Sequence, residues 1–273
     1  MDAIHYPNKP QQSIRRDYHC EKLLDYYILK YSCKYSSEIQ YALDQIDLQC
    51  YPHFQIVSLG CGGVPDLMAI EEKSGNKPIS YYGFDCEIFW RKIHDRVVNY
   101  FSGKYNIHFD RETELAQALC SCNESFLELP SANVIVMGYL LSNLKRSTPD
   151  ETIDCLCSGI AELLFSRKKE NSPSLFIFND VFYDDKGRFW FSKLQNSLRS
   201  YISLGKDNGN PFVKTDKCFH FEKSFRLTSD LVKAPIQLHN TSSNLYSNLI
   251  DDLSPCFGCA IKCTSFQWIY ELK

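Results

Sequence analysis

Three glycines that follow a short apolar run form the part of this chain best suited to binding a ligand. Residues 54–59 (FQIVSL) run directly into Gly60, Gly62 and Gly63. Glycine is needed where the backbone takes positive φ or lies against a ligand, because it carries no Cβ. Pro65 follows with its φ already set for a first helical turn. The pattern predicts a buried strand, a bare polar turn and the N-terminus of a helix.

A carboxylate strengthens this interpretation of the turn. Residues 79–84 (ISYYGF) form a second β-rich run, and Asp85 follows it, about twenty residues beyond the turn, where a carboxylate can accept hydrogen bonds from ribose hydroxyls. We therefore expect an adenosine-type ligand. Two other interpretations stay open: the glycines could form a simple strand-to-helix turn, and Asp85 could cap a helix that starts near Cys86.

Further polar residues follow other strand-like runs. They are Asp110, Tyr139 with Asn143, and the pair Asn179 and Asp180. The carboxyl ends of parallel strands lie at one edge of a sheet, where ligands bind. We expect one cleft to collect these residues with the glycine turn. Asp110 could instead be a loop carboxylate, and Tyr139 could be the last core residue of its strand.

The runs that precede these residues alternate with segments of helical periodicity. Strand-like runs cover 54–59, 79–84, 105–109, 132–139, 174–178, 225–232 and 265–272, and helical segments cover 66–72, 86–101, 112–125, 149–170 and 186–204. Such alternation requires a mostly parallel sheet with helices on both faces and right-handed crossovers. The sequence therefore predicts an α/β, doubly wound fold.

The N-terminal part differs from this pattern. We predict an arm and a helical cover over residues 1–50 and the main domain over residues 51–273. Apolar residues recur at helical spacing over 23–31 and again over 39–46, which predicts two helices with Ser36 or Ser37 as the cap between them. This tyrosine-rich segment is either a packed cover or a substrate lid, since tyrosine has flat apolar faces and a polar tip.

Composition limits the classes of function. The 273 residues are 44% hydrophobic and 14% aromatic, and the formal net charge is −3. A chain of this kind can bury a sizeable core, and it has no global basic field that would attract nucleic acid. No run reaches the length of a membrane span, and the first residues lack the apolar core of a signal peptide. We therefore expect a cytoplasmic protein with no membrane association.

The thirteen cysteines are scattered through predicted helices and strands, so we expect most to be reduced, buried thiols. Cys256, Cys259 and Cys263 have a spacing that could hold a metal ion, but a structural site needs a fourth ligand, and we predict no metal. The seven histidines show no ligand spacing. We expect most of them to be surface or packing residues.

Together, the glycine turn, the carboxylate and the strand ends resemble the motifs of class I S-adenosylmethionine-dependent methyltransferases. LGCGGVPDL resembles the first motif, YYGFD the second, VIVMGYLLSNL the fourth and SLFIFND the fifth strand, while NIHFD resembles the segment near the adenine. The resemblance covers roughly residues 54–272. It implies a Rossmann-like, seven-stranded sheet, here with an N-terminal helical extension.

The resemblance also implies S-adenosylmethionine as the cofactor and methyl transfer as the activity. Asp85 would bind the ribose, and Asp180 would act as a base or orient the methyl acceptor, with Tyr139 beside it. The residues implied to contact the cofactor are Gly60, Cys61, Gly62, Asp85, Cys86, Asp110, Gly138 and Tyr139.

The methyl acceptor is expected to be a small molecule or a site on RNA or protein. Gly138-Tyr139-Leu140-Leu141 stands where resembling amino-methylating enzymes of nucleic acids carry Asn/Asp-Pro-Pro-aromatic, and Ser58 stands where many relatives carry an acidic residue. One alternative is therefore a catalytically silent module that binds a partner protein through its N-terminal helices. Another is a nicotinamide-dependent oxidoreductase, which would share the turn and the carboxylate.

Overall fold

In the computed structural model, the described residues are 21–111, 131–141, 144, 152–165, 173–180, 185–203, 215–220, 225–226, 262–263 and 266–272. Among them, no helix combines the length and the apolarity that a bilayer crossing needs. The predicted helix at 112–125, Asn143, Cys256 and Cys259 lie outside the described residues.

A single seven-stranded sheet organises the domain. Its strands, in spatial order, are β3 (Asn106–Asp110), β2 (Ile79–Phe84), β1 (Phe54–Leu59), β4 (Val134–Gly138), β5 (Ser174–Asp180), β9 (Phe266–Leu272) and β6 (Thr215–His220). The first five are parallel neighbours. β9 runs antiparallel to both β5 and β6. The predicted mostly parallel, Rossmann-like sheet is confirmed.

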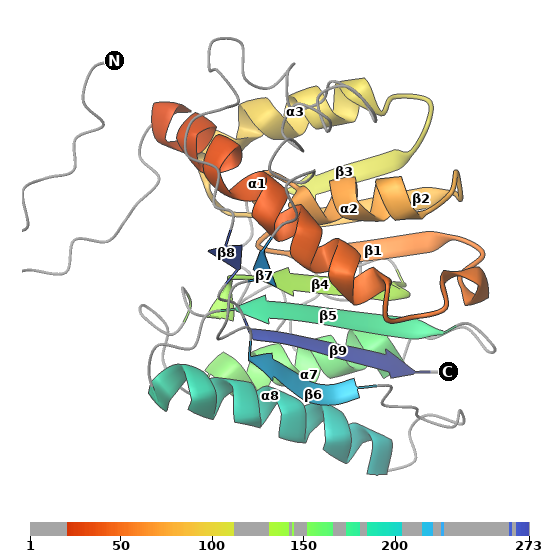
Figure 1. The fold of residues 1–273 in the computed structure, drawn as a ribbon, viewed down its shortest axis with the longest axis vertical. Helices are drawn as coiled ribbons and strands as arrows, with labels where there is room; N and C mark the ends of the chain where they lie inside the picture. The colour runs from red at the N-terminus through yellow and green to blue at the C-terminus, as the bar shows by residue number, and fades with distance from the viewer. Residues whose placement is uncertain are drawn as a thin grey trace, which may run out of the picture.

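Helices cover both faces of this sheet (Figure 1). One face carries α1 (Glu21–Leu43), α2 (Pro65–Lys73) and α3 (Arg91–Tyr100), and the other carries α7 (Thr152–Phe165) and α8 (Asp185–Ser203). Short 3-10 turns, η1 (Leu48–Cys50) and η2 (Ile88–Trp90), precede β1 and α3.

The two faces of each central strand divide the core. Side chains alternate across a strand, so Ile56 and Val136 pack with α1, α2 and α3, whereas Val57 and Ile135 pack with α7 and α8. Both clusters are formed by residues that are almost completely buried. This two-sided burial explains why the central strands are continuous apolar runs rather than alternating ones.

The predicted break between two N-terminal helices is wrong, because α1 is one continuous helix through Ser36 and Ser37. Both serines are buried, and Ser36 Oγ donates a hydrogen bond of 2.8 Å to the carbonyl oxygen of Pro65 at the start of α2. A serine costs a helix interior less than ~0.7 kcal/mol. Packing on α2, through residues such as Ile39 and Leu43, outweighs that preference.

Most of the predicted strand over 225–232 lies outside the described residues. Its first two residues, Phe225–Arg226, form β7, which pairs with β8 (Lys262–Cys263) in a separate two-stranded sheet. The seventh strand of the main sheet is β6, which the sequence did not predict. Its sequence, TDKCFH, lacks a continuous apolar run. A strand at the edge of a sheet does not need one.

The described cysteines agree in part with the expectation of buried thiols. Cys61 and Cys157 are buried, Cys155 is half-buried, and Cys50 and Cys86 are exposed.

Candidate functional site

The glycine turn is fastened to the end of β2. The backbone N–H groups of Gly60 and Cys61 both donate to the carbonyl oxygen of Phe84, at 2.9 Å each. Gly60 and Gly62 have φ values of 70° and 48°, in the left-handed region that glycine enters without steric cost. The chain then enters α2 through Pro65 at its first turn. The local structure is the predicted strand, turn and helix.

Asp85 holds the same turn through its side chain. Its Oδ2 accepts a hydrogen bond of 2.8 Å from the Gly62 N–H, and its Oδ1 accepts one of 3.0 Å from the Glu87 N–H. The carboxylate therefore orders both the turn and the start of the following segment. Its own N–H donates to the carbonyl oxygen of Asp110, at 3.1 Å. Three strand ends are thus joined at one point.

The electrostatics of Asp85 follow from its partly buried position. Desolvation raises its pKa to about 6, against the two backbone hydrogen bonds, which lower it. Asp85 is therefore mostly ionised at neutral pH. Each carboxylate oxygen has two lone pairs, so the group can accept further hydrogen bonds from ligand hydroxyls.

The Cys61 side chain points into the core. It is 3% exposed, and a Cβ added to Gly83 on β2 would lie 2.9 Å from its Sγ. Burial, together with the charges of Asp85 and Asp66, raises the pKa of this thiol well above its ordinary value. Cys61 is therefore a protonated packing residue. It can contribute only backbone groups to a binding site.

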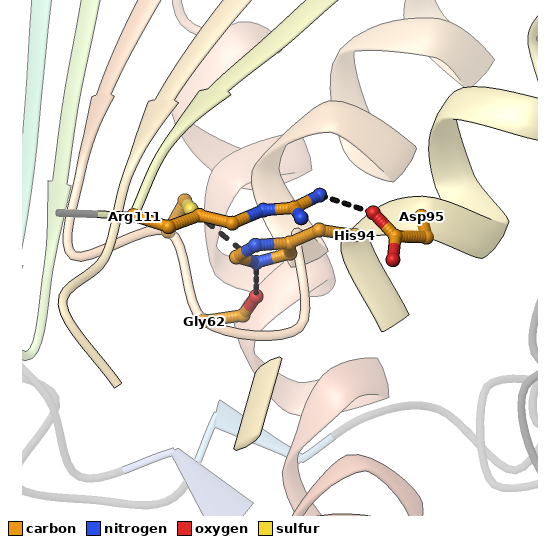
Figure 2. Close-up of polar contacts among 5 residues, drawn as sticks. Gly62, His94, Asp95 and Arg111 are labelled. Carbon is orange, nitrogen blue, oxygen red and sulfur yellow. Dashed lines mark hydrogen bonds and ion pairs between the residues drawn. The ribbon is translucent and has the colours of Figure 1, made fainter. Parts of the chain in front are cut away.

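His94 on α3 also contacts the turn, and it was not singled out from the sequence. Its Nε2 lies 2.8 Å from the carbonyl oxygen of Gly62 and 3.8 Å from Cys61 Sγ (Figure 2). The ring is completely buried and stacks on Phe109, with centroids 4.0 Å apart and planes 3° apart. His94 is thus a buried packing residue that also makes a hydrogen bond to the turn, a contact that was not predicted.

A buried carboxylate lies near Ser58, although position 58 is not acidic. Asp66, in the first turn of α2, accepts hydrogen bonds from Tyr81 Oη at 3.1 and 3.2 Å. Burial raises the pKa of Asp66, while hydrogen bonds from the Ser58 hydroxyl and from Tyr81 oppose that rise. Both Ser58 and Asp66 are buried. This network supports the base of the turn from within the core.

The end of β4 is open with respect to the described residues. None of their atoms lies within 4 Å of a Cβ added to Gly138. By contrast, an added Cβ would come within 3.1 Å of Leu140 at Gly60 and within 3.2 Å of Ile28 at Gly63. β4 pairs with β1. Gly138 therefore lies on the strand next to the glycine turn and has room beside its backbone for another group.

Tyr139 follows directly and is tied to α1. It has φ of 57°, a rare conformation for a residue with a side chain. Its N–H donates to the carbonyl oxygen of Asn179 at 2.7 Å, and its hydroxyl lies 2.9 Å from both carboxylate oxygens of Glu38. Its ring packs on Tyr35, with centroids 4.3 Å apart. Tyr139 is half-buried, and it is a junction between the sheet edge and α1.

The end of β5 is more enclosed than expected. β5 continues through Asn179 and Asp180, because β9 pairs with it as far as Asp180. Both side chains are buried, rather than lying at an open mouth. Gln267 Nε2 donates two hydrogen bonds: one to Asn179 Oδ1 at 2.9 Å and one to the carbonyl oxygen of Glu38 at 2.7 Å.

The predicted site residues therefore fall into two neighbouring groups. Gly60, Gly62, Asp85 and Asp110 are joined by the hydrogen bonds of the turn, whereas Gly138 and Tyr139 are joined to Asn179 and α1. Cys86 is exposed beside the first group. In the part of the chain that the structure describes, no group of three or more histidine, cysteine or acidic side chains could hold a metal ion.

Comparisons with known proteins give structural similarities only. No family model matches the chain, and no curated protein matches its sequence. Among solved structures, it is similar to the precorrin-6y C5,15-methyltransferase of Geobacter metallireducens GS-15, with 14% identity, a TM-score of 0.43 and coverage of 86% of this chain and 88% of that one.

Two further similarities involve longer proteins. An O-methyltransferase family protein from Burkholderia thailandensis shows 10% identity and a TM-score of 0.47, with 94% of this chain and 61% of that chain covered. Human N-acetylserotonin methyltransferase, in complex with SAM, shows 13% identity and a TM-score of 0.43, with 93% and 56% covered. The chain thus spans about three fifths of these two proteins.

The assignment of the fold rests on the chain's own sheet. The parallel strands have the Rossmann order 3-2-1-4-5, and the last strand of the chain inserts antiparallel between β5 and β6. By this strand order, the chain has a Rossmann-like α/β fold with one antiparallel strand inserted near the edge of its sheet.

Proposed function

We propose that this chain is an S-adenosylmethionine-dependent methyltransferase whose cofactor binds at the carboxyl ends of β1, β2 and β4. The observation that carries the proposal is the 2.8 Å hydrogen bond between the Gly62 N–H and Asp85 Oδ2. It joins a glycine turn and a carboxylate at the edge of a Rossmann-ordered sheet, which is where such folds bind nucleosides.

The residues present fit this cofactor. Asp85 has unused lone pairs for ribose hydroxyls, and Asp110 lies at the next strand end for the adenine side. The open space at Gly138 leaves room for the end of the cofactor that carries the methyl group. When bound, the cofactor supplies an electrophilic methyl group on a sulfonium. The protein then has to align an acceptor, and such alignment can lower the activation free energy by several kcal/mol.

The acceptor side is formed by Tyr139 and α1 in this proposal. Tyr139 follows the open space at Gly138, and its hydroxyl is paired with the buried Glu38 carboxylate. Asp180 lies at the end of the neighbouring strand β5. We propose that its carboxylate acts as a base or orients the acceptor. The acceptor itself is a small molecule or a site on RNA or protein.

Isothermal titration calorimetry with S-adenosylhomocysteine, the demethylated product, tests cofactor binding. We expect wild-type protein to bind it and not to bind NAD, whereas Asp85→Ala should bind it at least tenfold more weakly, because charge-assisted hydrogen bonds contribute about 1.5–3 kcal/mol. Asp154→Ala removes an exposed carboxylate on α7, on the other face of the sheet, where it pairs with Lys193; it is the matched control and should bind normally. Binding of NAD alone would favour an oxidoreductase and contradict the proposal.

Transfer itself needs a separate measurement. Protein incubated with methyl-labelled S-adenosylmethionine and a cell extract should transfer label to a small-molecule, RNA or protein fraction, and Tyr139→Phe should transfer less. Protein that binds the cofactor but labels no fraction would support a silent binding module and would contradict the enzymatic part of the proposal.

A further inference from the structure

The peptide groups on either side of Gly62 are held by two different side chains. The N–H of Gly62 donates to Asp85 Oδ2 at 2.8 Å. The carbonyl oxygen of Gly62 lies 2.8 Å from His94 Nε2. One bond fixes the peptide before the Cα and the other fixes the peptide after it. Gly62 has φ of 48°, and glycine alone would populate many other conformations.

The geometry also sets the tautomer of His94. A carbonyl oxygen can only accept, so Nε2 must carry the proton and donate it, and the neutral ring has a bare Nδ1. Nδ1 is buried and has no hydrogen-bond partner among the described residues. Figure 2 shows the Arg111 side chain beside the ring, with its guanidinium paired to Asp95 at 2.6 Å. Burial and this cation keep the ring neutral by lowering its pKa to about 4.

We propose that His94 is a positioning residue for the cofactor site: its Nε2–H fixes the Gly62 carbonyl, and so holds the glycine turn in the conformation that binds the cofactor. The inference rests on the proposed function, because it assigns a task within the same site. His94 does not touch the cofactor in this account. Its ring stack on Phe109 holds the imidazole in place, and the hydrogen bond acts on the turn.

Two substitutions separate the hydrogen bond from the packing. His94→Gln keeps an N–H donor at the position of Nε2 but loses the aromatic ring. His94→Phe keeps a ring that can stack on Phe109 but leaves the Gly62 carbonyl without its donor. His108→Phe, at an exposed position on β3, is the matched control for introducing phenylalanine.

Calorimetry with S-adenosylhomocysteine gives the expected contrast. His94→Phe should bind roughly 5- to 30-fold more weakly than wild type, as expected for one lost hydrogen bond to a buried carbonyl. His94→Gln and His108→Phe should remain within about threefold of wild type. Normal binding by His94→Phe together with weak binding by His94→Gln would overturn the proposal, since only the packing of the ring would then matter.

Nitrogen-15 NMR of the wild-type side chain tests the inference even if a variant fails to fold. We expect a protonated Nε2 and an unprotonated Nδ1 at neutral pH. A proton on Nδ1 instead would overturn the proposal. If wild-type protein binds no S-adenosylhomocysteine, the proposed function fails, whereas binding that is insensitive to His94→Phe refutes only the role of His94.

Discussion

At the scale of single residues, burial shifts the pKa values of the two side chains that contact Gly62 in opposite directions. Burial raises the pKa of Asp85 to about 6 and lowers that of His94 to about 4. In both cases the neutral form is favoured. As pH falls, the raised pKa of Asp85 therefore increases the free energy of unfolding, whereas the lowered pKa of His94 decreases it. The two effects oppose each other below pH 6.5.

The contribution of His94 to stability can be measured by replacing it with glutamine, which does not titrate. Its folded-state pKa lies below its unfolded value of 6.5, so its contribution to stability is full above pH 6.5 and is lost as pH falls toward 4. The free energy of unfolding of wild type minus that of His94→Gln should fall over this range by up to about 3 kcal/mol, at 1.36 kcal/mol per pKa unit. Urea unfolding at pH 4–7.5 measures it, and a pH-independent difference would contradict the assignment of a buried neutral ring.

Two glycines allow steric room to be tested directly. A Cβ at Gly83 would lie 2.8 Å from Phe109 Cδ1, whereas a Cβ at Gly138 would meet none of the described residues within 4 Å. Gly83→Ala should therefore lower the free energy of unfolding by about 1–3 kcal/mol through overpacking.

Gly138→Ala should leave stability nearly unchanged but weaken binding of S-adenosylhomocysteine, because its methyl group enters the space assigned to the cofactor. Thermal unfolding and calorimetry on the two variants separate these effects. Unchanged affinity in Gly138→Ala would place the cofactor elsewhere.

At the scale of elements, α1 is bonded to the strand ends at which we place the cofactor. Glu38 on α1 accepts from the Tyr139 hydroxyl at 2.9 Å, and its backbone carbonyl accepts from Gln267 on β9 at 2.7 Å. Ile28 lies beside Gly63. The helix thus extends from the glycine turn to the end of β4, along the edge where the strands end.

Removing the hydrogen bond between Tyr139 and Glu38 should weaken the attachment of α1 to the sheet. Tyr139→Phe leaves the buried Glu38 carboxylate short of a donor, so we expect a loss of about 1.5–3 kcal/mol in the free energy of unfolding. Amide hydrogen exchange in α1 should become faster.

Lys73→Ala is the control for this loss. It removes the exposed ion pair with Asp44, of 2.7 Å, and should cost less than ~1 kcal/mol. Equal losses in Tyr139→Phe and Lys73→Ala would show that the Tyr139 contact holds nothing in place.

The elements also show what the sequence could and could not predict. β1, β4 and β5 were predictable because burial on both faces demands unbroken apolar runs. The break at Ser36 was wrongly predicted because its hydroxyl is bonded to Pro65, a contact 29 residues away along the chain. β6 was not predicted because an edge strand does not need a continuous run of apolar residues, and its sequence has none.

At the scale of the whole molecule, the sheet brings residues from distant sequence segments together at the ends of neighbouring strands. Asp85, Asp110 and Gly138 lie far apart along the chain, and the parallel register places them at the ends of neighbouring strands. The glycine turn and Asp85 could be predicted from spacing. His94 could not, because its partner is a backbone carbonyl; its one sequence signal is its place beside Ile93 on the buried stripe of an amphipathic helix.

The central claim is that S-adenosylmethionine binds between the glycine turn, Asp85 and Gly138. A crystal structure of the full chain with S-adenosylhomocysteine tests it most directly. We expect ribose hydroxyls on the Asp85 carboxylate and the sulfur end of the ligand in the open space beside Gly138. A ligand bound away from these strand ends, or Gly138 still facing empty space in the complex, would contradict it.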